Sequence, residues 1–96
     1  VFEQTPAFAT DPAPRSVIIE DFDGDGKPDV ATGGTRVSVL RNTSAGEDIV
    51  LAPKITLNST ASGFVVASGD FDGDGLKDIV TANFAASNVS VFRNTS

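Results

Sequence analysis

The sequence predicts an all-β fold built from two tandem copies of one structural unit. Short segments rich in valine and isoleucine alternate with glycine, asparagine and serine, a pattern typical of strands joined by turns. No segment keeps a helical spacing of apolar residues over three turns. The acidic segment 21–29 returns at 70–78, and the segment 37–44 returns at 89–96. A repeat of about 50 residues indicates a solenoid, a propeller or an array of repeats.

Each copy is expected to form short antiparallel strands around its acidic segment. One strand precedes this segment, one follows it, and a third carries the repeated Val-Ser-Val sequence. A fourth strand is expected within 48–57, and a short insertion at 83–88 marks a turn. The first three strands are expected at 17–19, 30–31 and 37–40, and again at 65–67, 79–80 and 89–92.

The first ten residues resemble the region of the fourth strand. Pro6 precedes the first acidic segment much as Pro53 precedes the second. We therefore expect a single two-repeat segment over residues 1–96. Within it, 1–10 is the fourth strand of a neighbouring or last unit, 11–57 is the first repeat and 58–96 is the second.

Composition excludes several classes of site. The chain has 96 residues and a net charge of -6, and its seven lysines and arginines are scattered, so no basic patch for nucleic acid is expected. The absence of cysteine excludes disulfides and thiolate metal sites, and the absence of histidine removes the usual general base and zinc ligand. No apolar run approaches the ~20 residues that a membrane-spanning helix needs.

The two acidic segments predict cation sites. Each places aspartates at positions 1, 3, 5 and 9 of a glycine-rich loop, where the like charges repel one another unless a cation lies between them. Hard oxygen ligands in a flexible loop suit calcium, which accepts six to eight oxygens, whereas magnesium needs a stricter octahedron. The loop glycines, Gly24, Gly26, Gly73 and Gly75, permit the positive backbone angles of a sharp turn.

We expect two Ca²⁺ ions per chain, one in each loop. Position 7 would contribute only its backbone carbonyl, which explains why it is lysine in one loop and leucine in the other. The predicted ligands are Asp21, Asp23, Asp25, Lys27 and Asp29 in the first loop and Asp70, Asp72, Asp74, Leu76 and Asp78 in the second.

Two other interpretations of the loops were weighed. An EF-hand needs a glutamate at position 12 between two helices, but position 12 is Thr32 or Thr81 and the flanks are strands. Asp-Gly turns without an ion are the remaining alternative.

Two further pairs of side chains accompany the loops. Phe22 and Phe71, at position 2 of each loop, are expected to anchor the loop in the core. Arg41 and Arg93 are expected to be solvated or, alternatively, to pair with carboxylates of an adjacent unit.

The pattern Asp-Phe-Asp-Gly-Asp-Gly-x-x-Asp, followed by Val or Ile and then by Val-Ser-Val-x-Arg-Asn, resembles the calcium-binding repeats of integrin-type β-propellers, known as FG-GAP or VCBS repeats. The resemblance covers most of the chain in two copies. It implies that each repeat is one four-stranded blade whose acidic loop joins the first two strands. It also implies a non-catalytic role in adhesion or recognition. The Phe-Gly and Gly-Ala-Pro signatures of the integrin repeats are not clear, so the bacterial VCBS version is closer.

The resemblance also implies a larger assembly. Propellers of this family usually have six to eight blades, and radial closure protects the edges of their sheets. Two blades leave two broad faces exposed, since repeats gain their core from neighbours. We therefore expect a homo-oligomer in which a trimer or tetramer closes a propeller; an excised fragment or a designed unit is the alternative.

The expected function is a non-catalytic calcium-binding module for recognition or adhesion, with a carbohydrate or protein ligand. An extracellular or secreted location is expected because weak sites of this kind fill near millimolar calcium. A lectin is the alternative, with its sugar between blades or on the loops 31–36 and 81–88, where Phe84 is the only aromatic residue. A glycoside hydrolase or lyase using paired carboxylates is a more remote alternative.

Overall fold

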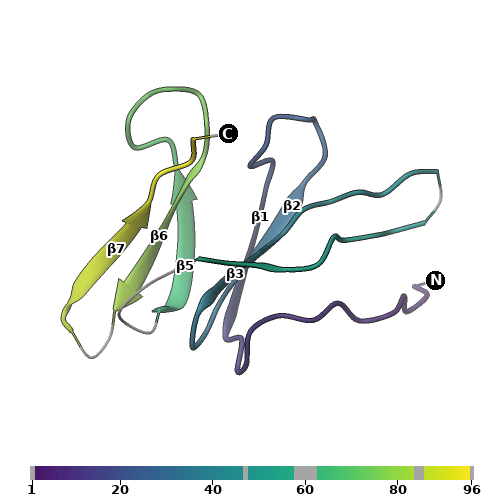
Figure 1. Cartoon of the computed structure of the whole chain (residues 1–96), viewed down its shortest axis with the longest axis horizontal. Coiled ribbons are helices and arrows are strands. Elements are labelled where there is room, and N and C mark those ends of the chain that lie inside the picture. Colours follow the sequence, from purple (N-terminus) through teal and green to yellow (C-terminus); the bar gives the residue numbers. More distant parts are fainter. Residues whose placement is uncertain (1, 47, 58–62, 84–85, 96) are drawn as a thin grey trace.

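The computed structural model describes residues 2–46, 48–57, 63–83 and 86–95, and these residues form two antiparallel sheets (Figure 1). Within the described part of the chain there is no helix, and hence none that could cross a membrane. The first sheet has the order β1 (Ser16–Glu20), β2 (Asp29–Gly33), β3 (Val37–Leu40) and β4 (Ile55–Leu57). The second has the order β5 (Gly63–Gly69), β6 (Asp78–Asn83) and β7 (Asn88–Phe92).

The all-β fold predicted from the sequence is confirmed, and each sheet corresponds to one repeat. Strands expected around each acidic segment are present, and every neighbouring pair is antiparallel. Two expected loops begin later than predicted, because β2 continues to Gly33 and β6 to Asn83. The described residues between β3 and β4, 41–46 and 48–54, form an extended arm in which isolated bridges join Asn42 to Leu51 and Ala45 to Asp48 (Figure 1).

Residues 2–15 belong to no strand of this chain. The expectation that residues 1–10 form the fourth strand of a neighbouring unit stays a prediction, because the strand that would pair with them lies in another unit.

The hydrophobic core lies between the two sheets. Antiparallel pairing places Ile18, Ala31 and Val39 on one face of the first sheet, since alternate residues of a strand point to the same side. This face packs on Val66 and Ile79 of the second sheet. The two repeats therefore bury their apolar side chains against each other, as stacked repeats do.

Phe22 and Phe71 occupy equivalent positions but different environments. Phe22 is 7% exposed and joins the core between the sheets, as the sequence predicted. The same prediction is wrong for Phe71, which is 59% exposed. The second sheet covers Phe22, whereas nothing in the described chain covers Phe71 in the same way.

Hydrogen bonds between described residues also join the two repeats. The backbone N–H of Val66 donates to Ser16 Oγ at 3.1 Å, and Ser68 Oγ donates to Glu20 Oε1 at 3.0 Å. Asn94 Nδ2 donates to the carbonyl oxygen of Phe22 at 2.6 Å. The last contact places the first acidic loop against the segment that follows β7.

The N-terminal segment covers part of the opposite face of the first sheet. Asp11 is 8% exposed, and its Oδ2 accepts hydrogen bonds of 2.7 Å from Ser38 Oγ and Thr56 Oγ1. Its Oδ1 pairs with Lys54 Nζ. The hydrogen bond from Lys54, followed by those from Thr56 and Ser38, lowers the pKa of Asp11 to about 2. Asp11 thus holds residues far apart in sequence together.

Gly34, directly after β2, lies against the backbone of this segment. A Cβ atom at Gly34 would collide with the carbonyl oxygen of Ala13. The segment therefore passes closer to the first sheet than any side chain at this position would allow.

We expect Asp11→Asn to lower the free energy of unfolding by about 1–3 kcal/mol at neutral pH, because it removes a charged acceptor from a buried cluster. The native pKa lies below the ordinary value of 3.8, so the carboxylate contributes fully above about pH 4 and loses its contribution as the pH falls towards 2. The difference between wild type and variant should narrow over this interval in urea unfolding. Glu3→Gln, which changes an exposed carboxylate, is the control; an equal effect of both variants would contradict the assignment.

Candidate metal centres

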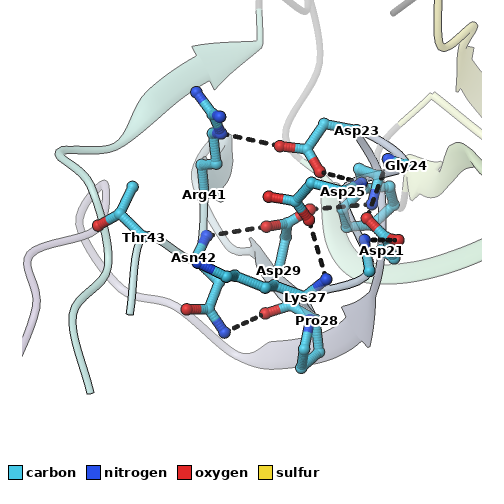
Figure 2. Close-up of polar contacts among 12 residues, drawn as sticks. Asp21, Asp23, Gly24, Asp25, Lys27, Pro28, Asp29, Arg41, Asn42 and Thr43 are labelled. Carbon is cyan, nitrogen blue, oxygen red and sulfur yellow. Dashed lines mark hydrogen bonds and ion pairs between the residues drawn. The ribbon is translucent and has the colours of Figure 1, made fainter. Parts of the chain in front are cut away.

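The first acidic loop, between β1 and β2, is shaped by hydrogen bonds from its own backbone. Asp21 Oδ1 accepts from the N–H of Gly24 at 2.9 Å (Figure 2). Asp21 Oδ2 accepts from the N–H of Gly26 at 2.8 Å. Gly24 and Gly26 have φ values of 76° and 85°, which confirms the predicted positive angles. The carboxylate at position 1 thereby folds the loop around itself.

Asp29 fixes the far end of this loop, where β2 begins. It is 1% exposed, and its Oδ2 accepts from the N–H of Phe22 at 2.9 Å. Its Oδ1 accepts from the N–H of Asn42 at 2.8 Å, so the loop is also tied to the segment after β3 (Figure 2). Both oxygens therefore have backbone partners, which a buried carboxylate requires.

Three of the predicted ligands of the first loop come together. Asp21, Asp23 and Asp29 each offer an oxygen, and these oxygens lie within 4.8 Å of one another. Asp25 lies outside this group, and its Oδ1 accepts from the N–H of Lys27 at 2.9 Å. Lys27 Nζ donates to the carbonyl of Ser44 at 2.7 Å. A role for the Lys27 carbonyl and for Asp25 as ligands stays a prediction.

The second loop, between β5 and β6, repeats this geometry. Asp70 accepts from the N–H groups of Asp74 at 3.1 Å and Gly75 at 2.8 Å. Asp78, 1% exposed, accepts from the N–H groups of Phe71 at 3.1 Å and Asn94 at 2.7 Å.

The three clustered aspartates of the second loop are also the equivalents of those in the first. Oxygens of Asp70, Asp72 and Asp78 lie within 4.8 Å of one another. Asp74 lies outside the group and accepts from the N–H of Leu76 at 2.9 Å. The metal-ligand role of the Leu76 carbonyl likewise stays a prediction.

Each cluster is paired with an arginine of its own repeat, a pairing that was not predicted. Arg41 Nε lies 2.8 Å from Asp23 Oδ2, and Arg93 Nε lies 2.8 Å from Asp72 Oδ2. The alternative that they pair with carboxylates of an adjacent unit is therefore wrong, whereas both side chains remain largely exposed, as expected. Because β3 pairs with β2 as β7 pairs with β6, the residue after each of these strands lies beside the acidic loop. The matching place of both arginines in the repeat was the only signal.

The carboxylates at positions 3 and 5 influence each other's pKa values. Burial raises the pKa of Asp23, and the nearby Asp29 carboxylate adds to this shift. The hydrogen bond from the N–H of Lys27 lowers the pKa of Asp25.

In the second loop the two pKa values also shift in opposite directions, but here the pKa is lowered at position 3 and raised at position 5. For Asp72, burial raises the pKa, but hydrogen bonds with Asp74 and Arg93 outweigh it and the pKa is lowered. For Asp74, the hydrogen bond from the N–H of Leu76 lowers the pKa, but burial and the Asp72 carboxylate outweigh it and the pKa is raised. One carboxylate in each pair thus has a raised pKa, because burial disfavours its charged form and like charges close by add to the shift.

The donor set of each loop fits a hard divalent cation. Asp23 Oδ2 is enclosed and has no hydrogen-bond partner among the described residues, although it contacts Arg41 as an ion pair. Carboxylate oxygens that converge from three positions are ligands that calcium prefers. The positive charge of one exposed arginine offsets only part of the negative charge in each cluster.

Comparison with known families gives one match. A family described as an FG-GAP-like repeat matches residues 21–81, from the start of the first acidic loop through the whole of the second. Neither the curated proteins nor the solved structures give a match.

We expect Asp29→Asn to destabilise the chain by about 1–3 kcal/mol even in excess chelator. One oxygen becomes an NH₂ group that faces a backbone N–H, so a buried donor loses its acceptor. Asp25→Asn, in the exposed part of the loop, is the matched control and should cost much less. Urea unfolding of both variants measures the difference, and equal losses would show that Asp29 has no structural role of its own.

Proposed function

Because the chain belongs to the family of FG-GAP-like repeats, we propose that it is a calcium-binding module for recognition or adhesion, with one Ca²⁺ ion in each acidic loop. FG-GAP-like repeats are generally non-enzymatic, and the module is proposed to be non-catalytic. The convergence of three aspartates in both loops is the observation that carries the calcium proposal.

Asp21, Asp23 and Asp29 would hold the ion in the first loop, and Asp70, Asp72 and Asp78 would hold it in the second. Asp25 and Asp74, with the carbonyls of Lys27 and Leu76, are proposed to complete the two shells. Bound calcium would supply the positive charge that lets neighbouring carboxylates remain ionised. Backbone N–H groups already orient the carboxylates of Asp21 and Asp29, so these two proposed ligands of the first site are held in position before an ion binds.

The first site would also strengthen the contact between the repeats. Asp29 connects the loop to Phe22, which packs between the two sheets. The carbonyl of Phe22 accepts from Asn94, beyond β7. An ion that fixes this loop is thus proposed to fix the relative position of the two sheets, which is how a structural metal contributes to folding free energy.

The alternatives receive less support. A cavity of about 250 Å³ lies between the sheets, but its lining is mainly apolar and includes Phe22, Leu57, Ile79 and Phe92, which does not favour a sugar. Phe84, on which the lectin hypothesis depended, lies outside the described residues. The two buried carboxylates, Asp29 and Asp78, each accept two backbone hydrogen bonds, so their oxygens are already engaged in holding the loops in place. We therefore retain the recognition module, and we propose an extracellular location, where calcium is near millimolar.

Calcium titration tests the proposal. Isothermal titration calorimetry should give two sites in the wild type and one site in Asp23→Asn or in Asp72→Asn, because each variant removes charge from one cluster. Each filled site should add about 1.4 kcal/mol of stability when free calcium is tenfold above its Kd. Asp48→Asn, outside both loops, should retain two sites. A melting temperature that calcium and chelator leave unchanged, with no heat of binding, would overturn the proposal.

We also expect Arg41→Gln to raise the calcium affinity of the first loop several-fold. The guanidinium contacts Asp23, so it both occupies a proposed ligand and repels an incoming cation. Titration of Arg41→Gln in an Asp72→Asn background isolates the first site. Arg36→Gln, an exposed arginine away from the ion pairs, is the control, and an equal affinity change in both variants would indicate only a general charge effect.

A further inference from the structure

We propose that a second copy of this chain docks head to tail on the first. In this arrangement the outer face of β5–β7 in one copy packs on the exposed part of the first sheet of the next copy. Residues 8–10 of the next copy then pair with β7 as a fourth strand. The two surfaces are matched because the contact between the two sheets within one chain already shows how equivalent surfaces fit.

The face to be covered is the repeat equivalent of a face that is already buried. In the first sheet, Ile18, Ala31, Val37 and Val39 belong to the face that packs on the second sheet. Their equivalents in the second sheet share one face, because Ala67 pairs with Val80, Val80 with Val91, and Ala82 with Val89. These equivalents are Ala67, Val80, Val89 and Val91.

That face is apolar and uncovered in the described structure. Val89 is 62% exposed and Val91 is 54% exposed, and Val65 on the same face is also exposed. Phe71 adds its ring to the exposed apolar surface, whereas its equivalent Phe22 is buried between the sheets. Contiguous apolar surfaces of this kind mark interaction sites.

The complementary surface lies on the first sheet, on the side away from the second. Val17 and Ile19 of β1 are exposed there. Their equivalents in β5 are Val66, which is buried against the first sheet, and Ser68, which bonds to Glu20 of that sheet. The two surfaces that pack together between the sheets of one chain thus each have an exposed equivalent elsewhere on the same chain.

The N-terminal segment supplies the missing strand. β3 pairs with β4, but β7 has no partner on its outer side among the described residues. Phe8 and Ala9 line a cavity with Leu40 of the first sheet. Ile55 and Leu57 of β4 line a cavity with Phe92, the equivalent of Leu40, in the second sheet.

Residues 8–10 therefore lie over the first sheet much as β4 lies over the second. The alignment of Pro6 with Pro53 then defines the register of the added strand. Thr10 would pair with Val89 and Phe8 with Val91, as Leu57 pairs with Val37 and Ile55 with Val39 within the chain.

The side-chain amides of Asn94 and Asn42, which are equivalent in the repeat, differ in the same way. Asn94 Nδ2 donates both to the carbonyl of Lys77 and, across the sheets, to the carbonyl of Phe22. The equivalent Asn42 Nδ2 donates to the carbonyl of Pro28, and the described residues provide no second acceptor. In the proposed contact the second acceptor is the carbonyl of Phe71 in the neighbouring copy.

The contact joins two different surfaces, so it is directional. Such an association grows by repetition and either closes into a ring or continues as a filament. Closure would give a propeller in which every sheet has the same neighbours as the two sheets seen here.

Light scattering after size-exclusion chromatography tests the contact. The wild type should form a multimer at high protein concentration, whereas Val91→Asp and Val17→Asp should each be impaired in one surface only. Each variant alone should be monomeric, and a mixture of the two should form a one-to-one dimer through the surfaces that remain intact. Ile49→Asp, at an exposed residue of the β3–β4 arm, should leave the multimer unchanged. Circular dichroism confirms that each variant is folded.

A wild-type chain that stays monomeric, or single variants that remain multimeric, would overturn the proposal. The measurement is made in excess calcium and in chelator. Because the apolar faces contain no proposed metal ligand, assembly that persists without bound calcium would support the contact even if the calcium proposal fails.

Cysteine pairs test the register. The chain contains no cysteine, so a Thr10→Cys/Val89→Cys variant can form disulfides only through the introduced pair. Under mild oxidation it should form covalent multimers, because the two residues would face each other in neighbouring copies. Thr5→Cys/Val89→Cys is the out-of-register control. Equal crosslinking of both variants, or none in the first, would contradict the proposed strand pairing.

Discussion

Each repeat must accommodate several carboxylates close together in one short loop, and the surrounding strands are arranged to meet this requirement. Like charges at this spacing are tolerated only if donors and cations surround them. Backbone N–H groups meet this need at Asp29 and Asp78, which are nearly inaccessible to solvent at the beginning of β2 and β6. Each of these two side chains connects its own strand to the segments that follow the two neighbouring strands. Each acidic loop is therefore held to its own sheet by hydrogen bonds to a buried aspartate.

The strands and the acidic loops could be predicted from the sequence because their signals are local. Alternating valines identify β3 and β7, and the spacing of the aspartates identifies the two groups of carboxylates that come together. The pairing of Arg41 with Asp23 could not be derived in this way, since it depends on how β3 pairs with β2 and so on where the residue after β3 lies relative to the acidic loop. The matching place of Arg41 and Arg93 in the repeat does not indicate which carboxylate each side chain contacts.

Contacts between distant segments were missed for a related reason. Three distant parts of the chain meet in the cluster of Asp11, Ser38, Lys54 and Thr56. None of these residues lies in a sequence motif that would indicate its partners. Likewise, the first six residues of the two loops, which include Phe22 and Phe71, are the same in sequence, yet only Phe22 is buried. Local sequence determines the form of each loop, whereas the adjoining sheet determines the environment of its phenylalanine.

The position of Gly34 has a consequence for how such a chain could arise by duplication. Its equivalent in the second repeat is Asn83, which is buried and bonds to Ser90 and Asn88 on β7. An asparagine in place of Gly34 would strike the backbone at Ala13. The two repeats have therefore diverged, and only the first has a glycine where the N-terminal segment passes close to the sheet. If their order in the chain were exchanged, the asparagine would lie at this close contact and the N-terminal segment would have to take another path.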